Sequence, residues 1–130
     1  MISEKERDDA KKVEVVFSLQ SLGAIKAPHF SLAVKDYLIE QYGEQMVANG
    51  GLKVITTLDW NLQQLAEKEV TDGVKRNEEL YGSKNAALVA EDTKSGQILA
   101  MVGSKDYFDV ANDGNFNVVT QGMRQPGSAL

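Results

Sequence analysis

Hydrophobic residues recur with helical spacing in two stretches of the chain. The first predicted helix begins around Pro28, since proline is favoured in a first turn, and ends at Gly43. The second runs from about residue 60 to about residue 80, with Asp59 as its N-cap. The apolar positions that define the two faces are Phe30, Val34, Tyr37, Leu38 and Tyr42 in the first helix, and Leu62, Leu65, Ala66, Val70 and Val74 in the second.

Other apolar stretches have the density and β-branched content of strands. Residues 52–58 form one such run, and residues 13–19 form a shorter one. Residues 86–91 and 97–102 are two more, joined by a turn-rich link of hairpin length. The predicted fold class is α+β: a small antiparallel sheet, made of a hairpin at about 86–103 and a strand at about 52–58, packed with helices.

Polar segments connect these elements. A capping-box pattern, with serine at position 3 and glutamate at position 6, predicts a charged helix from about Glu4 to about Lys12. One more helical turn is expected over Glu44–Asn49, before a flexible Gly-Gly joint. Residues 103–123 have no regular pattern and are expected to form a solvated loop leading toward the C-terminal segment.

Composition excludes several classes of function. The chain has 130 residues, a formal net charge of −5 and no block of basic residues, so nucleic acid is not an expected partner. It has no cysteine, which excludes disulfides and thiolate metal sites. No apolar run approaches the ~18 residues of a membrane-spanning helix. The acidic and amide residues of 103–123 lack the spacing of a calcium loop, so we predict no metal and no cofactor.

The single histidine, His29, stands in the first turn of the first helix. A metal or triad role would need partners that sequence spacing does not identify. We therefore expect a structural role for His29. Trp60 is expected to pack under the strand at 52–58 rather than to contact a ligand.

The final segment, residues 124–130, has the composition of a loop that delivers a serine to a helix start. Pro126 and Gly127 favour a turn, and Ser128 is followed by two strong helix formers. The unpaired N–H groups of a first helical turn favour negative charge that develops beside such a serine. Most Gly-Ser pairs are ordinary turns or caps, so this pair by itself is weak support for a nucleophile.

The complete string Arg-Gln-Pro-Gly-Ser-Ala-Leu resembles the active-serine segment of penicillin-binding proteins, in which the serine opens an S-x-x-K motif. Four earlier segments resemble landmarks of the class A members of that family, in the family's order. They are residues 25–30, residues 51–59, residues 88–92 together with 95–103, and Phe116-Asn117. Together these five landmarks suggest that the chain is a fragment of a class A penicillin-binding protein.

The resemblance implies a role for each part of the chain. Residues 1–57 would correspond to the linker between a glycosyltransferase and a transpeptidase domain, and residues 58–130 to the truncated front of the transpeptidase. The parent protein would be anchored by a transmembrane helix and would act outside the bacterial cytoplasmic membrane. It would cross-link peptidoglycan stem peptides through an acyl-enzyme on Ser128, which β-lactams would also acylate.

The departures from the family pattern are equally specific. The motif lysine would be residue 131, and no S-x-N or K-T-G segment is present. Arg124 stays protonated and cannot act as the base. We therefore expect the isolated chain to be inactive. The alternative is a non-catalytic linker or interaction module that docks flanking domains or a cell-wall partner, and we also predict dimerisation through an exposed sheet edge.

Overall fold

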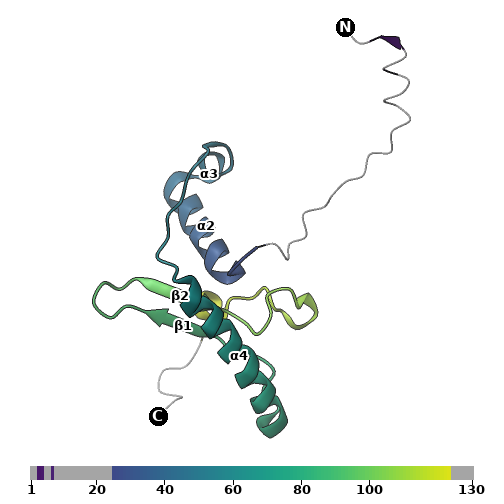
Figure 1. Cartoon of the computed structure of the whole chain (residues 1–130), viewed down its shortest axis with the longest axis vertical. Coiled ribbons are helices and arrows are strands. Elements are labelled where there is room, and N and C mark those ends of the chain that lie inside the picture. The colour runs from purple at the N-terminus through teal and green to yellow at the C-terminus, as the bar shows by residue number, and fades with distance from the viewer. Residues whose placement is uncertain (1–2, 5–6, 8–24, 124–130) are drawn as a thin grey trace.

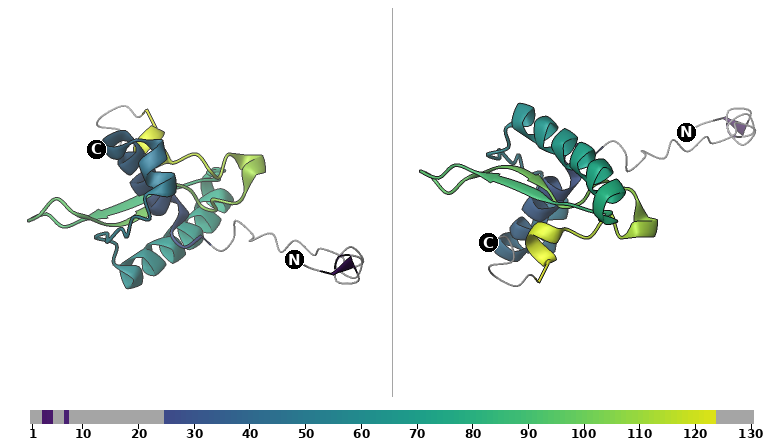
Figure 2. Two further views of the ribbon diagram at one scale, coloured as in Figure 1. Left: turned by 90° about the horizontal axis from the view of Figure 1, so that it is seen from above. Right: turned by 90° about the horizontal axis from the view of Figure 1, so that it is seen from below.

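The computed structural model describes residues 3–4, 7 and 25–123. Their centre is a β-hairpin with helices on both faces (Figure 1). Helix α4 covers one face, while α2 and the short α5 lie on the other (Figure 2). The predicted α+β class is confirmed.

Helix α2 spans Pro28–Tyr42 and begins, as predicted, with proline in its first turn. It ends at Gly43, whose φ of 82° lies in the region that favours glycine. The six-residue α3, Glu44–Asn49, follows directly and lies at the end of α2 away from the hairpin (Figure 1). Both helices agree with the sequence prediction.

The longest helix, α4, spans Trp60–Tyr81. The Asp59 carboxylate accepts hydrogen bonds from the N–H groups of Asn61 and Leu62, at 2.9 and 3.1 Å, so the predicted N-cap is confirmed. Gly82, in the left-handed conformation with φ 69°, ends the helix.

The hairpin consists of β1, Leu88–Glu91, and β2, Ile98–Val102, paired antiparallel as predicted. Its register pairs Val89 with Met101 and Ala90 with Ala100. A bulge follows Ala90, because Glu91 pairs with Ile98 rather than with the next residue in register.

The predicted third strand at residues 52–58 is wrong. The sheet has two strands, and this segment is irregular and almost wholly exposed. Its links to β2 are a hydrogen bond from the Thr57 hydroxyl to Ile98 O at 2.6 Å and, just beyond it, one from Asp59 N–H to Leu99 O at 2.9 Å. The β-branched composition favours extended backbone, but a strand needs a continuous ladder, which these contacts do not form.

Two hydrophobic clusters hold the layers together. On one face of the hairpin, Ala66 and Val70 of α4 pack against Ala100 and Val102 of β2. On the other face, a second cluster joins α2 to β2 and to the segments before α4 and within α5. Its buried members are Ala27, Phe30 and Met101, with Ala33, Val34, Leu58, Ile98 and Val119 packed against them.

The helical faces differ from the prediction at three positions. Tyr37 and Tyr42 of α2 are exposed, since that half of α2 extends beyond the hairpin. Leu65 of α4 is also exposed, at 53%, while the polar Gln63 is 1% exposed. The buried stripe of α4 is therefore Gln63, Ala66, Val70 and Val74.

Residues 103–123 are more ordered than the solvated loop predicted for them. They contain a 3-10 turn at Val110–Asn112 and the four-residue helix α5, Val118–Gln121. Four of their residues, Gly103, Ser104, Gly114 and Asn117, are buried. Local sequence gives no signal for this order, which arises from contacts with α2 and β2.

Several predictions fall wholly or partly outside the described residues. Of the predicted N-terminal helix, Glu4 and Arg7 are described and are helical, with Arg7 N–H donating to Ser3 O at 3.1 Å. The extended piece at 13–19 and the whole segment 124–130, with Ser128, lie outside them. Within residues 3–4, 7 and 25–123, no helix is long and apolar enough to cross a membrane.

Candidate functional site

The described parts of the segments that carry the family resemblance meet at β2. The start of α2 forms a buried cluster with Met101 of β2, and Leu58 packs against that cluster. Asp59 N–H donates to Leu99 O. On the C-terminal side, Val118 N–H donates to Gly103 O at 3.1 Å, directly after β2 ends. Four landmarks that are separated in sequence thus meet at β2, and we call this arrangement the platform. They are residues 25–30, residues 51–59, residues 88–92 with 95–103, and residues 116–117.

A buried histidine joins α2 to the segment after β2. His29 Nε2 and Ser104 Oγ lie 2.9 Å apart, and Ser104 Oγ donates to Gly114 O at 2.6 Å. His29 and Ser104 are 5% and 2% exposed. The Tyr107 ring meets His29 edge-on, with centroids 5.1 Å apart.

The direction of these hydrogen bonds decides what the pair can do. A serine hydroxyl has one proton, and here it goes to Gly114 O, so Ser104 accepts from a protonated His29 Nε2. A nucleophilic serine needs the opposite arrangement, in which the imidazole accepts the hydroxyl proton. The pair therefore connects α2 to the loop and does not activate Ser104.

The environment of His29 favours its neutral form. Burial lowers the pKa of His29 below its ordinary value, and a hydrogen bond involving the backbone of Gly114 opposes this in part. A neutral ring with its proton on Nε2 fits the chain of hydrogen bonds to Ser104 and Gly114. The structural role and first-turn position expected for His29 agree with this arrangement.

Asn117 is a further buried polar residue of the platform, at 7% exposed. Its side-chain Oδ1 accepts from Val119 N–H at 3.1 Å and so caps α5. Its Nδ2 donates to Met101 Sδ at 3.4 Å, and its own N–H donates to Gln121 Oε1 at 2.9 Å. Phe116-Asn117 was a landmark of the resemblance, but sequence alone gave Asn117 no role.

Gln63 connects α4 to β2 through its side-chain amide. Its amide oxygen accepts from Met101 N–H at 2.8 Å, while its Nε2 donates to Met101 O at 3.1 Å and to Glu67 Oε1 at 2.8 Å. A sequence signal for Gln63 did exist. It stands three residues before Ala66 and seven before Val70, on the buried stripe of α4.

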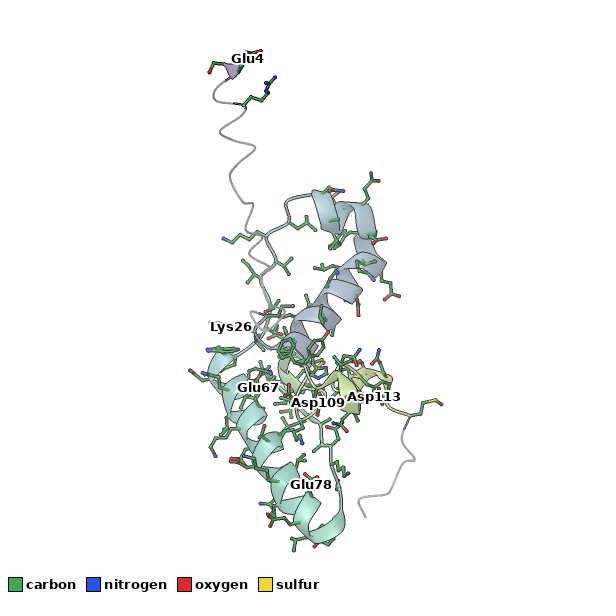
Figure 3. All side chains as sticks on the ribbon, turned by 90° about the vertical axis from the view of Figure 1, so that its right-hand side faces the viewer. Glu4, Lys26, Glu67, Glu78, Asp109 and Asp113 are labelled. Atoms are coloured by element: carbon green, nitrogen blue, oxygen red, sulfur yellow. The ribbon has the colours of Figure 1, made fainter. Side chains whose placement is uncertain are left out.

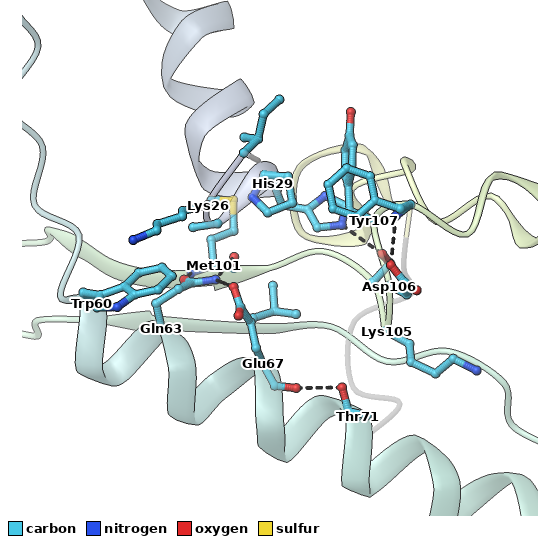
Figure 4. Close-up of a pocket in the computed structure, with 16 residues that line it drawn as sticks. Lys26, His29, Trp60, Gln63, Glu67, Thr71, Met101, Lys105, Asp106 and Tyr107 are labelled. Atoms are coloured by element: carbon cyan, nitrogen blue, oxygen red, sulfur yellow. Dashed lines mark hydrogen bonds between the residues drawn. The ribbon is translucent and has the colours of Figure 1, made fainter. Parts of the chain in front are cut away.

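A cavity of about 380 Å³ opens beside the platform, between the start of α4, residues 25–29 and residues 104–108 (Figure 4). Lys26 lies over the Trp60 ring, with Nζ 5.2 Å from the centroid. Trp60 lines this cavity and is 37% exposed, so the expectation that it packs under a strand is wrong. On the other side of the cavity lie Asp106 and Tyr107.

The charged side chains are spread over the described surface (Figure 3). Glu67 lies near the middle of α4 and Glu78 toward its far end, while Asp109 and Asp113 belong to the loop after β2. Among the described residues, no three histidine or acidic side chains are grouped so that they could hold a metal ion.

Comparison with known proteins gives a consistent result. Penicillin-binding protein 2D of Bacillus subtilis (strain 168) is 29% identical over 134 residues, covering 100% of this chain and 18% of the relative. Penicillin-binding protein 1B of Vibrio cholerae is 36% identical over 108 residues, covering 82% of this chain and 13% of the relative. Penicillin-binding protein 1A of Aquifex aeolicus is 32% identical over 95 residues, covering 68% of this chain and 13% of the relative.

The chain belongs to the class A penicillin-binding proteins. It spans less than a fifth of the length of these relatives, at 18% for the Bacillus protein and 13% for the Vibrio protein. No family model matches the chain, and no solved structure matches it. The described part of this penicillin-binding protein segment holds the platform, and its candidate nucleophile, Ser128, stands five residues after the last described residue, Met123.

Proposed function

We propose that this chain is the part of a peptidoglycan transpeptidase that leads up to its active serine. Residues 1–57 would be a linker that follows a glycosyltransferase domain, and residues 58–130 would begin the transpeptidase domain. Ser128 would be the acyl nucleophile. The protein would act at the outer face of the cytoplasmic membrane on peptidoglycan stem peptides, and β-lactams would bind at the same serine.

The observation that carries this proposal is the combination of the Ser128 segment with the convergence of the other landmarks on β2. Sequence resemblance places the landmarks in the family's order, and the structure brings four of them into contact. A set of segments retained only as loose connectors has no physical reason to share one buried platform. This contact supports the proposal although Ser128 itself lies outside the described residues.

The proposed chemistry is acyl transfer. Ser128 Oγ would form a bond to the carbonyl carbon of the substrate, the amide C–N bond would break, and the hydroxyl proton would pass to the departing nitrogen. This proton transfer needs a base, which we assign to a lysine at position 131, one helical turn after the serine. The 130-residue chain ends before that position, so we expect it to form no adduct.

The proposal is tested by mass spectrometry of the complete protein encoded by the gene, mixed with benzylpenicillin. We expect one covalent adduct, which the Ser128→Ala variant does not form. The isolated 130-residue chain serves as a second control and should remain unmodified. An adduct that persists in Ser128→Ala would contradict the assignment of Ser128, and the absence of any adduct in the unmodified complete protein would contradict the proposed function.

The second candidate function is a non-catalytic module that docks neighbouring domains. The specific observation in its favour is that His29 and Ser104, a histidine–serine pair within the described residues, have the hydrogen-bond direction of a structural link. It predicts no adduct in either the complete protein or the isolated chain, so the same experiment separates the two functions.

A further inference from the structure

We propose that the cavity beside the start of α4 is a binding site for an alkylammonium group, such as the side-chain amine of a lysine-like residue in a peptide. The Glu67 carboxylate would bind the ammonium, and the exposed part of the Trp60 ring would cover the alkyl stem. Both residues line the cavity, which α4 shares with residues 25–29 and 104–108 (Figure 4). The inference goes beyond the proposed function and does not depend on it.

One face of α4 forms a wall of the cavity. Trp60, Gln63, Glu67 and Thr71 line it, and their spacing of three or four residues places them in one row along the helix. Trp60 and Glu67 are separated by about 10 Å along the helix axis, because each residue adds about 1.5 Å. The volume of about 380 Å³ is that of a small-ligand site. The cavity can therefore hold an extended side chain that reaches from Trp60 to Glu67.

The Glu67 carboxylate has no cationic partner within residues 25–123. Its side chain is half-buried and lies at the cavity, where Oε1 accepts from Gln63 Nε2 at 2.8 Å. The one ion pair found among the described residues joins Lys68 to Asp72, at 2.8 Å, and both of those side chains are exposed. Hydrogen bonds between an ammonium and a carboxylate are stronger than those between neutral groups. Glu67 is therefore the group to which a ligand ammonium would bind.

Trp60 supplies an aromatic surface at the other end of this row. Its side chain is partly exposed and lines the cavity. A lysine of the protein itself already uses the ring, since Lys26 Nζ lies 5.2 Å from the centroid. The face of an indole ring attracts a cation electrostatically. The contact with Lys26 thus shows that an alkylammonium chain can lie against Trp60.

The other charged groups that line the cavity favour a cation beside Glu67. Asp106 lies on the other side of the cavity, and its Oδ1 accepts from Phe108 N–H at 2.9 Å. Lys105 also lines the cavity, but its amine points away from Glu67 (Figure 4). Lys26 is held at the Trp60 end. The region around Glu67 is therefore complementary to a ligand that carries a positive charge.

The test uses the 130-residue chain and the fluorescence of Trp60, which is its only tryptophan. The probe is Nα-acetyl-lysine amide, and the control ligand is Nα-acetyl-norleucine amide, which has the same stem without the ammonium. We expect a saturable change in Trp60 fluorescence, with the lysine probe binding at least about tenfold more tightly than the norleucine control. A third ligand, n-butylamine, distinguishes the sources of the amine: weaker binding than the lysine probe indicates a peptide, and equal binding indicates a free amine.

Glu67→Gln is the decisive variant, because the glutamine oxygen can still accept from Gln63 while the negative charge is lost. We expect this variant to bind the lysine probe about tenfold more weakly, with binding of the norleucine control unchanged. Glu69→Gln is the matched control. It removes the same charge from an exposed position of α4 that does not line the cavity, and it should change lysine binding by less than about twofold.

Thermal unfolding shows whether each variant is folded at the temperature of the titration. If Glu67→Gln does not fold, the salt dependence of the unmodified chain replaces it: added sodium chloride should weaken binding of the lysine probe and leave the norleucine control unchanged. Equal binding of these two ligands would overturn the inference, as would undiminished lysine binding in a folded Glu67→Gln variant or the absence of any saturable change. None of these results would affect the assignment of Ser128.

Discussion

The two outer edges of the hairpin are built differently. Along β2, the edge is closed by groups that are not strands: the Gln63 amide bonds to both backbone groups of Met101, and Asp59 N–H bonds to Leu99 O. The Thr57 hydroxyl bonds to Ile98 O. A glutamine side chain has one acceptor and one donor group in amide geometry, so it can replace the backbone of a missing neighbour.

The edge of β1 is open. Because Met101 directs its N–H and C=O to Gln63, its pairing with Val89 is of the non-hydrogen-bonded kind, and Val89 directs its own N–H and C=O away from β2. No hydrogen bond to those two groups is found among the described residues. Val89 is also 48% exposed. A further strand could therefore form hydrogen bonds along the β1 edge, whereas the corresponding groups of β2 already have partners.

Removing the Gln63 side chain should have the largest effect. Gln63→Ala leaves Met101 N–H and C=O without partners in a buried position, and each such group costs about 1–3 kcal/mol. We expect the free energy of unfolding of the 130-residue chain to fall by about 2–5 kcal/mol, measured by urea denaturation.

Gln64→Ala is the matched control, because Gln64 is the next residue of α4 and is exposed. We expect its effect to be within about 0.5 kcal/mol. Equal destabilisation by Gln63→Ala and Gln64→Ala would show that Gln63 does not close the β2 edge, and the contrast between the two edges would be lost.

Blocking the open edge should change association and leave the fold intact. Val89→Pro removes the outward N–H, which the hairpin does not use, and proline is tolerated at such edge positions. The dimerisation expected from the sequence stays a prediction, and the open β1 edge is where we expect it to occur. We expect the unmodified chain to self-associate at high concentration in analytical ultracentrifugation and Val89→Pro to do so less.

Ala90→Pro is the control for this substitution, since Ala90 pairs with Ala100 in the hydrogen-bonded register and its N–H is part of the ladder. It should unfold the hairpin. A chain that stays monomeric at high concentration without any substitution would contradict the prediction that the open edge drives association.

The smallest expected effect is a pH dependence of the free energy of unfolding. It arises from His29, which lies against Gly103 at the end of β2. Burial lowers the pKa of His29 in the folded protein, so the unfolded chain binds a proton first as the pH falls. The contribution of His29 is therefore complete above its ordinary pKa, about 6.5, and decreases as the pH falls below that value.

We expect the free energy of unfolding to decrease between about pH 7 and pH 5, and to decrease less in His29→Gln, whose amide can still donate to Ser104. Urea denaturation at a series of pH values measures both slopes. Identical slopes for the two proteins would show that His29 does not titrate differently on folding.

Much of the fold could be predicted from local sequence. Pro28, Gly43 and Asp59 mark helix ends by mechanisms that act within one turn, and the structure confirms all three. The hairpin was equally predictable, because its strands are joined by a short turn in which Gly96 has a φ of 72°.

The wrong structural predictions concern residues whose contacts are made with parts of the chain that are distant in sequence. Residues 52–58 have strand composition, but the β2 edge beside them is occupied by the Gln63 amide and by Asp59 rather than by a ladder. Leu65 fits an apolar pattern, yet the hairpin covers the stripe that includes Gln63. Composition cannot show which of two neighbouring faces another element will cover.

In the candidate site, too, features set by neighbouring residues could be predicted, and contacts between distant residues could not. Ser128 was identified from its neighbours in sequence, and its role stays a prediction because it lies outside the described residues. His29 and Ser104 are 75 residues apart and Gln63 and Met101 are 38 apart, so no local pattern could have paired them. The contacts among these four residues became visible only in the fold.

The central claim, that this chain leads up to the active serine of a transpeptidase, is tested most directly by reading the source gene beyond the codon for Leu130. We predict that residue 131 is lysine and that S-x-N and K-T-G segments follow at domain-scale distance. Any other residue at position 131, or a stop codon there, would contradict the claim, and Ser128 would then be a helix cap in a non-catalytic module.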